Sequence, residues 1–324
     1  MRYLSGKDLD DLVSPMTLIA ALEQALRDFA ENKTIVPVRQ HVDFGDNTLL
    51  TMPAIGEGAF GTKIVSVIPS NAKRGLPVTG GLMLLSDRVT GLPLAVLDAA
   101  MLTAQRTGAV GALGLKYTTP LDIERIGVIG TGVQGTWQAI FACAVRKIQT
   151  VYFIARSEEK AQRFVDAVSR HVPSVRFSRC GDVYELLTQS QAVIAATTSR
   201  DPVLPAEREL LEDKHFVSVG SFKPSMQELP LSVYPLAQQV VVDSDAARSE
   251  VGDLIEPLSR GLLRDEHIIH IADLVAGRRS VDIEHTTVFK SVGMALYDLY
   301  AARAFLAEAQ QLDRGTRLDP SSHS

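Results

Sequence analysis

The sequence predicts an α/β protein in which a doubly wound parallel sheet is joined to a smaller α+β domain. Three observations lead to this prediction. A glycine-rich turn joins a short apolar segment to an Ala-rich segment near the middle of the chain. From Ile123 onward, apolar segments of strand length alternate with segments of helical pattern, which is typical of parallel sheets. The region before Ile123 instead contains hairpin-like pairs of alternating segments.

The glycine turn has the spacing G-x-G-x-x-G and reads Gly130-Thr131-Gly132-Val133-Gln134-Gly135. The apolar segment 125–129 precedes it and the Ala-rich segment 137–145 follows it. In such a strand–turn–helix unit the first glycine allows the tight turn and the second lets a pyrophosphate approach the backbone. The third lets the helix pack on the strand, and the helix N-terminus offers N–H donors to the phosphates. The motif predicts a Rossmann-type dinucleotide-binding domain, and a glycine turn without a ligand is the alternative.

The end of the second predicted strand indicates which dinucleotide binds. An Asp or Glu usually stands there in NAD-binding domains, where it holds the ribose 2′-hydroxyl. Here the strand 150–155 runs into Ala155-Arg156-Ser157. An arginine can hold a 2′-phosphate by charged hydrogen bonds, whereas an acid would repel it. We therefore expect Arg156 and Ser157 at the ribose and a preference for NADPH, with NADH also accepted. A solvated Arg156 is the alternative.

Local patterns predict the other elements. Ser14 and Pro15 should begin a helix that runs to Glu31, and Asp98 should cap a helix that ends near Leu115. Strands are expected at 36–44, 48–52, 60–68, 82–86 and 92–97, and in the parallel sheet at 125–129, 150–155, 191–197, 215–220 and 239–243. A last helix, 294–309, follows the nucleotide domain. The substrate domain is thus predicted to be discontinuous, residues 1–118 plus 290–324, around a dinucleotide-binding domain of residues 119–289.

Composition restricts the class of protein. The 324 residues are 46% hydrophobic and 22% charged, as expected of a two-domain globular protein. The net charge of −5 gives no reason to expect nucleic acid or an anionic membrane as a partner. Cys143 and Cys180 lack C-x-x-C spacing, which argues against a disulfide scaffold or a zinc site and suits a cytoplasmic location. We expect no metal and no membrane-spanning segment.

Two basic residues occupy positions where the pattern predicts burial. Lys63 shares a strand face with Gly61 and Val65, and Arg106 shares a helix face with Leu102 and other apolar residues. A buried cation needs a partner, which is either an acidic side chain or an anionic ligand. Arg39 lies on a polar face and, taken alone, is expected to be solvated. Together the three cations could bind a substrate carboxylate, and Lys63 is the best proton-transfer candidate because burial lowers a lysine pKa.

At these residues the chain resembles the ornithine cyclodeaminase/mu-crystallin family over nearly its whole length. Four segments carry the resemblance. They are Phe60-Gly61-Thr62-Lys63 with Ser70-Asn71 and Gly75-Leu76-Pro77; Thr90-Gly91-Leu92-Pro93-Leu94-Ala95 with Asp98-Ala99 and Leu102-Thr103-Ala104-Gln105-Arg106-Thr107; the glycine turn; and Phe289-Lys290-Ser291-Val292-Gly293.

The resemblance implies a homodimer formed through the first domain and an active site between the domains. It implies that the three cations meet the carboxylate of an amino or imino acid, the small-molecule substrate, and that Val292 borders it. It also implies the nucleotide-facing residues. Beyond the glycine turn, in which Val133 and Gln134 would line the pyrophosphate, these are Thr197, Val219 and Gly220 along the nucleotide and Ser291 at the nicotinamide.

One departure from the family bears on the reaction. Cyclodeaminases carry an aspartate two residues after the glycine that ends the fourth parallel strand, and here Phe222 stands in that place. Phe222 cannot move a proton, so ornithine cyclodeamination is not expected. The chain is most similar to members that reduce Δ1-pyrroline-2-carboxylate to L-proline, with Δ1-piperideine-2-carboxylate as a further substrate. An alanine-type or opine-type dehydrogenase is the enzymatic alternative, and a crystallin-like ligand-binding protein is the non-enzymatic one.

Overall fold

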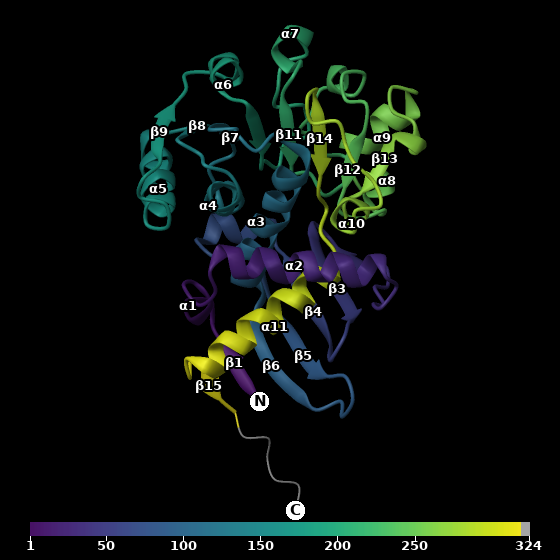
Figure 1. The fold of residues 1–324 in the computed structure, drawn as a ribbon. Helices are drawn as coiled ribbons and strands as arrows, with labels where there is room; N and C mark the ends of the chain where they lie inside the picture. The colour runs from purple at the N-terminus through teal and green to yellow at the C-terminus, as the bar shows by residue number, and fades with distance from the viewer. Residues whose placement is uncertain (319–324) are drawn as a thin grey trace, which may run out of the picture. The chain divides into compact units, whose positions relative to one another are not determined.

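The computed structural model describes residues 1–318, which form two compact units (Figure 1). One unit comprises Met1–Arg106 together with the chain from Met294 onward, and the other comprises Thr107–Gly293. The first is α+β and the second is a doubly wound parallel sheet with helices, so the predicted fold class is confirmed. Within residues 1–318, no helix combines the length and the apolar character that crossing a bilayer requires.

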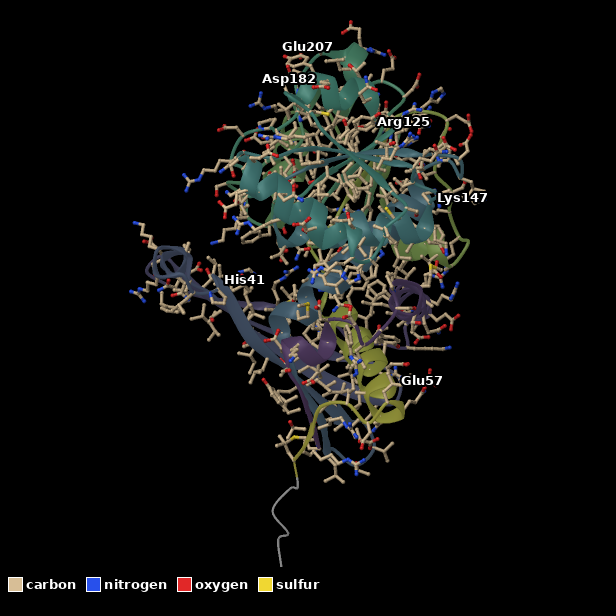
Figure 2. The ribbon with its side chains drawn as sticks, turned by 90° about the vertical axis from the view of Figure 1, so that its left-hand side faces the viewer. His41, Glu57, Arg125, Lys147, Asp182 and Glu207 are labelled. Atoms are coloured by element: carbon tan, nitrogen blue, oxygen red, sulfur yellow. The ribbon has the colours of Figure 1, made fainter. Side chains whose placement is uncertain are left out.

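The first unit is built on a seven-stranded sheet in the order β15-β1-β6-β5-β4-β3-β2. Its strands are β1 (Arg2–Leu4), β2 (Gln40–Phe44), β3 (Asn47–Ile55), β4 (Ala59–Val67), β5 (Thr79–Asp87), β6 (Pro93–Asp98) and β15 (Thr316–Arg317). Its helices are α1 (Gly6–Leu9), α2 (Pro15–Ala30), η1 (Pro69–Arg74), α11 (Ala295–Gln311) and the beginning of α3 (Ala99–Thr118). In Figure 2, His41 on β2 and Glu57 past the end of β3 mark exposed positions of this unit.

Both predicted helix caps are present. The Ser14 hydroxyl accepts the Thr17 N–H at 3.1 Å, and the Asp98 carboxylate accepts the Met101 N–H at 2.8 Å. The first predicted strand is shorter than expected, because pairing with β3 begins only at Gln40. Pro37 has no N–H to donate to a ladder, which is consistent with residues 36–39 remaining outside the sheet.

The two faces of this sheet differ in what covers them. Helix α11 packs on β3, β4 and β5, and helix α2 packs on α11. Lys63 of β4 faces α11, whereas its neighbour Ile64 points to the opposite face and is 40% exposed. The ladder register places other apolar side chains on that opposite face, namely Val42, Phe44, Leu82 and Leu84, all of them exposed. We refer to these five side chains as the open face.

The second unit is built on an eight-stranded sheet in the order β13-β12-β14-β11-β10-β7-β8-β9, and all its pairs are parallel. The strands are β7 (Arg125–Ile129), β8 (Thr150–Ile154), β9 (Arg176–Arg179), β10 (Ala192–Ala195), β11 (His215–Ser218), β12 (Val240–Val242), β13 (Ile268–His270) and β14 (Thr287–Lys290). The helices are α4 (Val133–Val145), α5 (Glu158–Ser169), α6 (Val183–Gln189), α7 (Arg208–Leu211), η2 (Leu231–Val233), α8 (Ala247–Glu250), α9 (Gly252–Ser259), η3 (Asp265–His267) and α10 (Ile271–Val275).

Strand β7 is the point at which the strand order reverses, because its neighbours are β8 on one side and β10 on the other. Helices cover both faces there. A side chain at Gly127 would collide with Leu186 of α6, whereas Val128 approaches Gly135 of α4. Adjacent strand residues point to opposite faces, so α6 and α4 lie on opposite sides of β7. Ligands of open α/β sheets bind at the carboxyl ends of the strands at such a reversal, which is where the glycine turn lies.

The compact units divide the chain at positions other than the predicted 118/119 and 289/290. The second part of α3 packs within the sheet unit. Gln138 of α4 donates to the Thr107 carbonyl at 2.8 Å, and the Thr287 hydroxyl donates to the Thr118 carbonyl at 2.7 Å. At the other boundary, β14 pairs with β11 and β12, which keeps Ser291 and Val292 in the sheet unit. Strand periodicity could not show which unit a helix end joins.

Candidate functional site

Two buried cations of the first unit share one carboxylate. Lys63 on β4 and Arg106 on α3 are 2% and 6% exposed, as their apolar faces predicted. Lys63 Nζ lies 2.8 Å and Arg106 Nε 2.9 Å from the same atom, Oδ1 of Asp298 on α11. Lys63 Nζ also donates to the Thr103 hydroxyl at 3.1 Å. Of the two partners considered for the cations, the structure therefore contains the acidic one, and one positive charge remains in excess.

Asp298 was missed by the sequence analysis. The signal for it was a carboxylate among apolar residues, between Tyr297 and Leu299 on the last helix. Its side chain is completely buried, and its second oxygen, Oδ2, has no hydrogen-bond partner within residues 1–318. One oxygen of the carboxylate thus pairs with both cations, and the other can still accept a hydrogen bond.

Burial lowers the pKa of the Lys63 ammonium from 10.5 to about 8. The positive charges of Arg106 and Arg39 lower this pKa as well, while the charge and hydrogen bond of Asp298 raise it. Arg39 is partly buried, and its positive charge is close enough to contribute to the lowered pKa of Lys63. Lys63 is therefore mostly protonated at neutral pH but titrates close to it.

The three glycines of the glycine turn differ in the space around them. Gly130 has a φ of 101°, and a Cβ there would lie 2.5 Å from the Ala196 carbonyl oxygen. A Cβ at Gly135 would collide with the Gly130 carbonyl, whereas one at Gly132 would meet no atom within 4 Å. Gly132 is the N-cap of α4, so no side chain caps that helix. Open backbone and uncapped N–H groups form a cradle that fits a pyrophosphate.

Two arginines lie at the end of the second parallel strand. Arg156 is exposed and, within residues 1–318, its guanidinium has no ion-pair or hydrogen-bond partner. Ser157 caps α5 by accepting the Lys160 N–H at 3.3 Å. Arg179 donates to the Ala155 carbonyl at 3.0 Å and pairs with Glu158 at 2.6 Å. Sequence reasoning missed Arg179 because it did not predict β9.

A buried carboxylate holds the turn that follows β14. Asp243, at the end of β12, accepts the Ser291 hydroxyl at 2.7 Å and the Val292 and Gly293 N–H groups at 2.9 Å each. The Ser291 hydroxyl hydrogen is directed at Asp243, so its oxygen can act toward a ligand only as an acceptor. The predicted strand 239–243 contained Asp243, but nothing in the sequence paired it with the distant residue Ser291.

The carboxyl ends of four parallel strands bring the remaining predicted residues to one edge of the sheet. The glycine turn follows β7, Thr197 follows β10, Val219 and Gly220 follow β11, and Ser291 follows β14. These strands are neighbours in the sheet in the order β14-β11-β10-β7. Phe222, which replaces the aspartate of cyclodeaminases, is 40% exposed in the loop after β11.

Comparison with known proteins gives a consistent result. The profile of the ornithine cyclodeaminase/mu-crystallin family matches residues 4–311. The Δ1-pyrroline-2-carboxylate reductase of Bacillus cereus is 35% identical over 98% of this chain and 100% of its own. The Thermococcus litoralis Δ1-pyrroline-2-carboxylate reductase, solved with NADH and L-proline, is 31% identical with a TM-score of 0.91, over 98% and 100% of the two chains. An archaeal alanine dehydrogenase dimer with bound NAD is 29% identical with a TM-score of 0.90, over 98% and 99%.

The shared carboxylate generates a stability prediction. Asp298→Asn should lower the free energy of unfolding by about 3–5 kcal/mol, because it leaves two buried cations without their anion. Lys63→Met should then cost less in the Asp298→Asn protein than in the wild type, since Lys63 is an unpaired buried charge there. Urea unfolding of the four proteins measures both effects.

These four proteins form a double-mutant cycle. Its control is Asp28, another buried carboxylate of the first unit, which accepts hydrogen bonds from Tyr300 and Gln24. Lys63→Met and Asp28→Asn should have additive costs. If the costs of Lys63→Met and Asp298→Asn in free energy of unfolding were also additive, this would contradict the interpretation that the two cations share the Asp298 carboxylate.

Proposed function

Because the chain belongs to the ornithine cyclodeaminase/mu-crystallin family, we propose that it is an NAD(P)H-dependent reductase of cyclic imino acids. Its substrate is Δ1-pyrroline-2-carboxylate, which yields L-proline, and Δ1-piperideine-2-carboxylate, which yields L-pipecolate, is a second substrate. The observation that carries the proposal is the buried Lys63–Asp298–Arg106 cluster, with its excess positive charge, in a chain that also contains the glycine turn. End-to-end similarity to the Bacillus cereus reductase supports it.

The cation cluster suits a substrate carboxylate. The bond from Arg106 to Asp298 uses only Nε, so the terminal Nη groups remain for bidentate binding of a carboxylate. Arg39, whose charge acts on Lys63, adds a third cation. In this proposal Asp298 is the internal counter-ion that keeps the cations ordered without substrate, and Val292 borders the substrate.

Reduction of a C=N bond adds a hydride to carbon and requires a proton on nitrogen. A bound nicotinamide supplies the hydride. Lys63 is the group that we assign to the proton, because its pKa of about 8 leaves it protonated at neutral pH and able to release the proton. Beyond this proton, reduction of a cyclic imine requires little other chemistry from the protein. Holding the carboxylate in one orientation therefore contributes much of the acceleration.

The cofactor residues follow from the sheet edge. The cradle at Gly132 and the uncapped start of α4, with Val133 and Gln134, would hold the pyrophosphate. Thr197, Val219 and Gly220 would line the nucleotide, and the Ser291 oxygen would accept a hydrogen bond from the nicotinamide carboxamide. Arg156 and Ser157, supported by Arg179, would bind a 2′-phosphate, which favours NADPH over NADH.

Other functions receive less support. Similarity to the archaeal alanine dehydrogenase keeps an alanine-type or opine-type dehydrogenase as the second candidate. Ornithine cyclodeamination is disfavoured because Phe222 offers no carboxylate. A crystallin-like protein that binds a neutral ligand would not need buried cations.

The open face of the first sheet supports a homodimer. Exposed apolar side chains from three strands on one face of a sheet are unusual for a monomer and typical of an association surface. They include Phe44, Ile64 and Leu84, which would pack against the same residues of a second copy. We propose this face as the dimer interface.

The cysteines support a cytoplasmic location. Both are free thiols, and Cys180 is buried. Burial raises the pKa of Cys143 to about 12 and that of Cys180 to about 11, so both stay protonated and unreactive. Such thiols suit a reducing compartment.

A substrate screen tests the function. Purified protein should oxidise NAD(P)H with Δ1-pyrroline-2-carboxylate and Δ1-piperideine-2-carboxylate far faster than with pyruvate plus ammonia or pyruvate plus amino acids. It should form neither ammonia nor proline from ornithine with catalytic NAD. Faster turnover of pyruvate with ammonia would favour the alanine-type dehydrogenase. Stoichiometric formation of ammonia and proline from ornithine would show that Phe222 does not prevent cyclodeamination.

Titration of Lys63 predicts the pH dependence. The value of kcat/KM should fall as pH rises through about 8, because Lys63 loses its proton there. Lys63→Met should lower kcat and remove this inflection, while ionisation of the substrate itself remains in both profiles. Arg106→Leu should mainly raise KM for the imine, and Arg39→Leu should do so more weakly. Variants with a lower Tm but wild-type kinetics would exclude this site.

Cofactor preference depends on Arg156. The wild type should have a higher kcat/KM with NADPH than with NADH, and Arg156→Ala should reduce the NADPH value roughly tenfold or more while leaving the NADH value nearly unchanged. Arg163→Ala, at an exposed arginine of α5 that pairs with Glu159, is the matched control and should change neither value. Equal use of both cofactors by the wild type would contradict the assignment.

Oligomeric state tests the open face. Leu84→Glu should convert the dimer to a monomer, because a charge buried in an apolar interface has no partner. Light scattering after size-exclusion chromatography measures the mass. Leu121→Glu, at an exposed leucine of the second unit, should stay dimeric. A dimeric Leu84→Glu protein, or a monomeric wild type, would rule out this interface.

A further inference from the structure

One completely buried carboxylate, that of Glu228, accepts hydrogen bonds from two different loops at the sheet edge. Its Oε1 accepts the Thr197 N–H at 2.6 Å and the Thr197 hydroxyl at 2.9 Å. Its Oε2 accepts the Gly220 N–H at 2.8 Å, the Ser221 N–H at 3.3 Å and the Ser218 hydroxyl at 2.8 Å. Thr197 follows β10 and the other three residues end or follow β11, so Glu228 joins the ends of two adjacent strands.

The two loops are in direct contact at this carboxylate. A Cβ at Gly220 would lie 2.5 Å from Glu228 Oε1 and would collide with the backbone of Thr197. Gly220 is therefore small because Thr197 and Glu228 occupy the space beside it. Any displacement of the carboxylate would change the spacing of the two loops.

A second layer of charge holds Glu228 in place. Lys290, the last residue of β14, has its Nζ 3.9 Å from Glu228 Oε2 and 3.4 Å from Asp253 Oδ2, and all three side chains are completely buried. Lys290 Nζ also donates to the Ser218 and Ser221 hydroxyls, at 2.9 and 2.7 Å. Asp253 Oδ1 accepts the backbone N–H of Glu228 at 2.9 Å. The network thus extends to a third strand end, directly before Ser291.

We propose that Glu228 is a positioning residue for the dinucleotide cofactor: it fixes the spacing of the loops after β10 and β11 without touching the cofactor. Every group that faces its oxygens is a donor, so only a carboxylate, an acceptor at both oxygens, satisfies them all. Burying a charge is costly, and the network around Lys290 offsets that cost. This inference rests on the proposed use of a nicotinamide cofactor by the same loops.

The decisive variant is Glu228→Gln, which keeps the size of the side chain but turns an amide NH₂ toward one set of donors. The dissociation constants for NADH and NADPH, measured by fluorescence titration, should each rise roughly tenfold or more. The KM for Δ1-pyrroline-2-carboxylate at saturating cofactor should change by less than about twofold, because the cation cluster is intact. Asp28→Asn is the matched control: it removes a buried carboxylate of the first unit and should leave both dissociation constants unchanged.

A readout independent of the cofactor accompanies the titration. Amide hydrogen exchange at Thr197, Gly220 and Ser221 should be faster in Glu228→Gln than in the wild type, while exchange in β7 should be unchanged. If Glu228→Gln does not fold, Ser218→Ala removes one donor and should still weaken cofactor binding selectively. Unchanged cofactor binding in a folded variant, or unchanged exchange at the three amides, would overturn the inference. A wild type that binds neither NADH nor NADPH, with faster exchange in the variant, would refute the proposed cofactor and leave Glu228 as a loop clamp alone.

Discussion

A single oxygen atom of Asp298 neutralises two buried cations, and the charged interior of the first unit depends on it. Without that anion, Lys63 and Arg106 would be isolated charges on a strand and a helix that are otherwise apolar. Because one carboxylate serves two cations, the cluster is paired enough to be buried and still positively charged. That excess charge makes the cluster suitable for an anionic substrate, rather than a purely structural ion pair.

In the second unit, buried carboxylates likewise require partners. Asp243, Glu228 and Asp253 are completely buried acids at or beside the carboxyl ends of parallel strands, and most of their partners are backbone N–H and hydroxyl groups of the turns that follow. Such turns leave N–H groups that no neighbouring strand accepts. Buried carboxylates accept them, which orders the edge of the sheet at which the glycine turn also lies. The proposed cofactor residues thus owe their positions to acids that would not themselves contact a cofactor.

The absence of an acid at position 222 also bears on the reaction. Phe222 lies in the loop after β11. Two earlier residues of this loop, Gly220 and Ser221, donate backbone hydrogen bonds to Glu228. The loop is therefore held by the same carboxylate, while the side chain two residues after Gly220 is apolar and partly exposed. An imine needs no activation of an attacking amine, so the proposed reduction requires no acid at this position.

The sequence by itself determined the fold class, the glycine turn, five of the parallel strands and the burial of Lys63 and Arg106. Each of these is written in local periodicity or in a short motif, where neighbours in the chain are neighbours in space. It did not reveal β9, β13 and β14, which are three or four residues long, nor that Lys290 within β14 is buried. Only the tertiary structure decided the partners of the charges: Asp298 lies 235 residues from Lys63, and Glu228 lies 31 residues from Thr197. Such pairs form because folding brings distant segments together and a buried charge must then find a partner, a condition that no local pattern records.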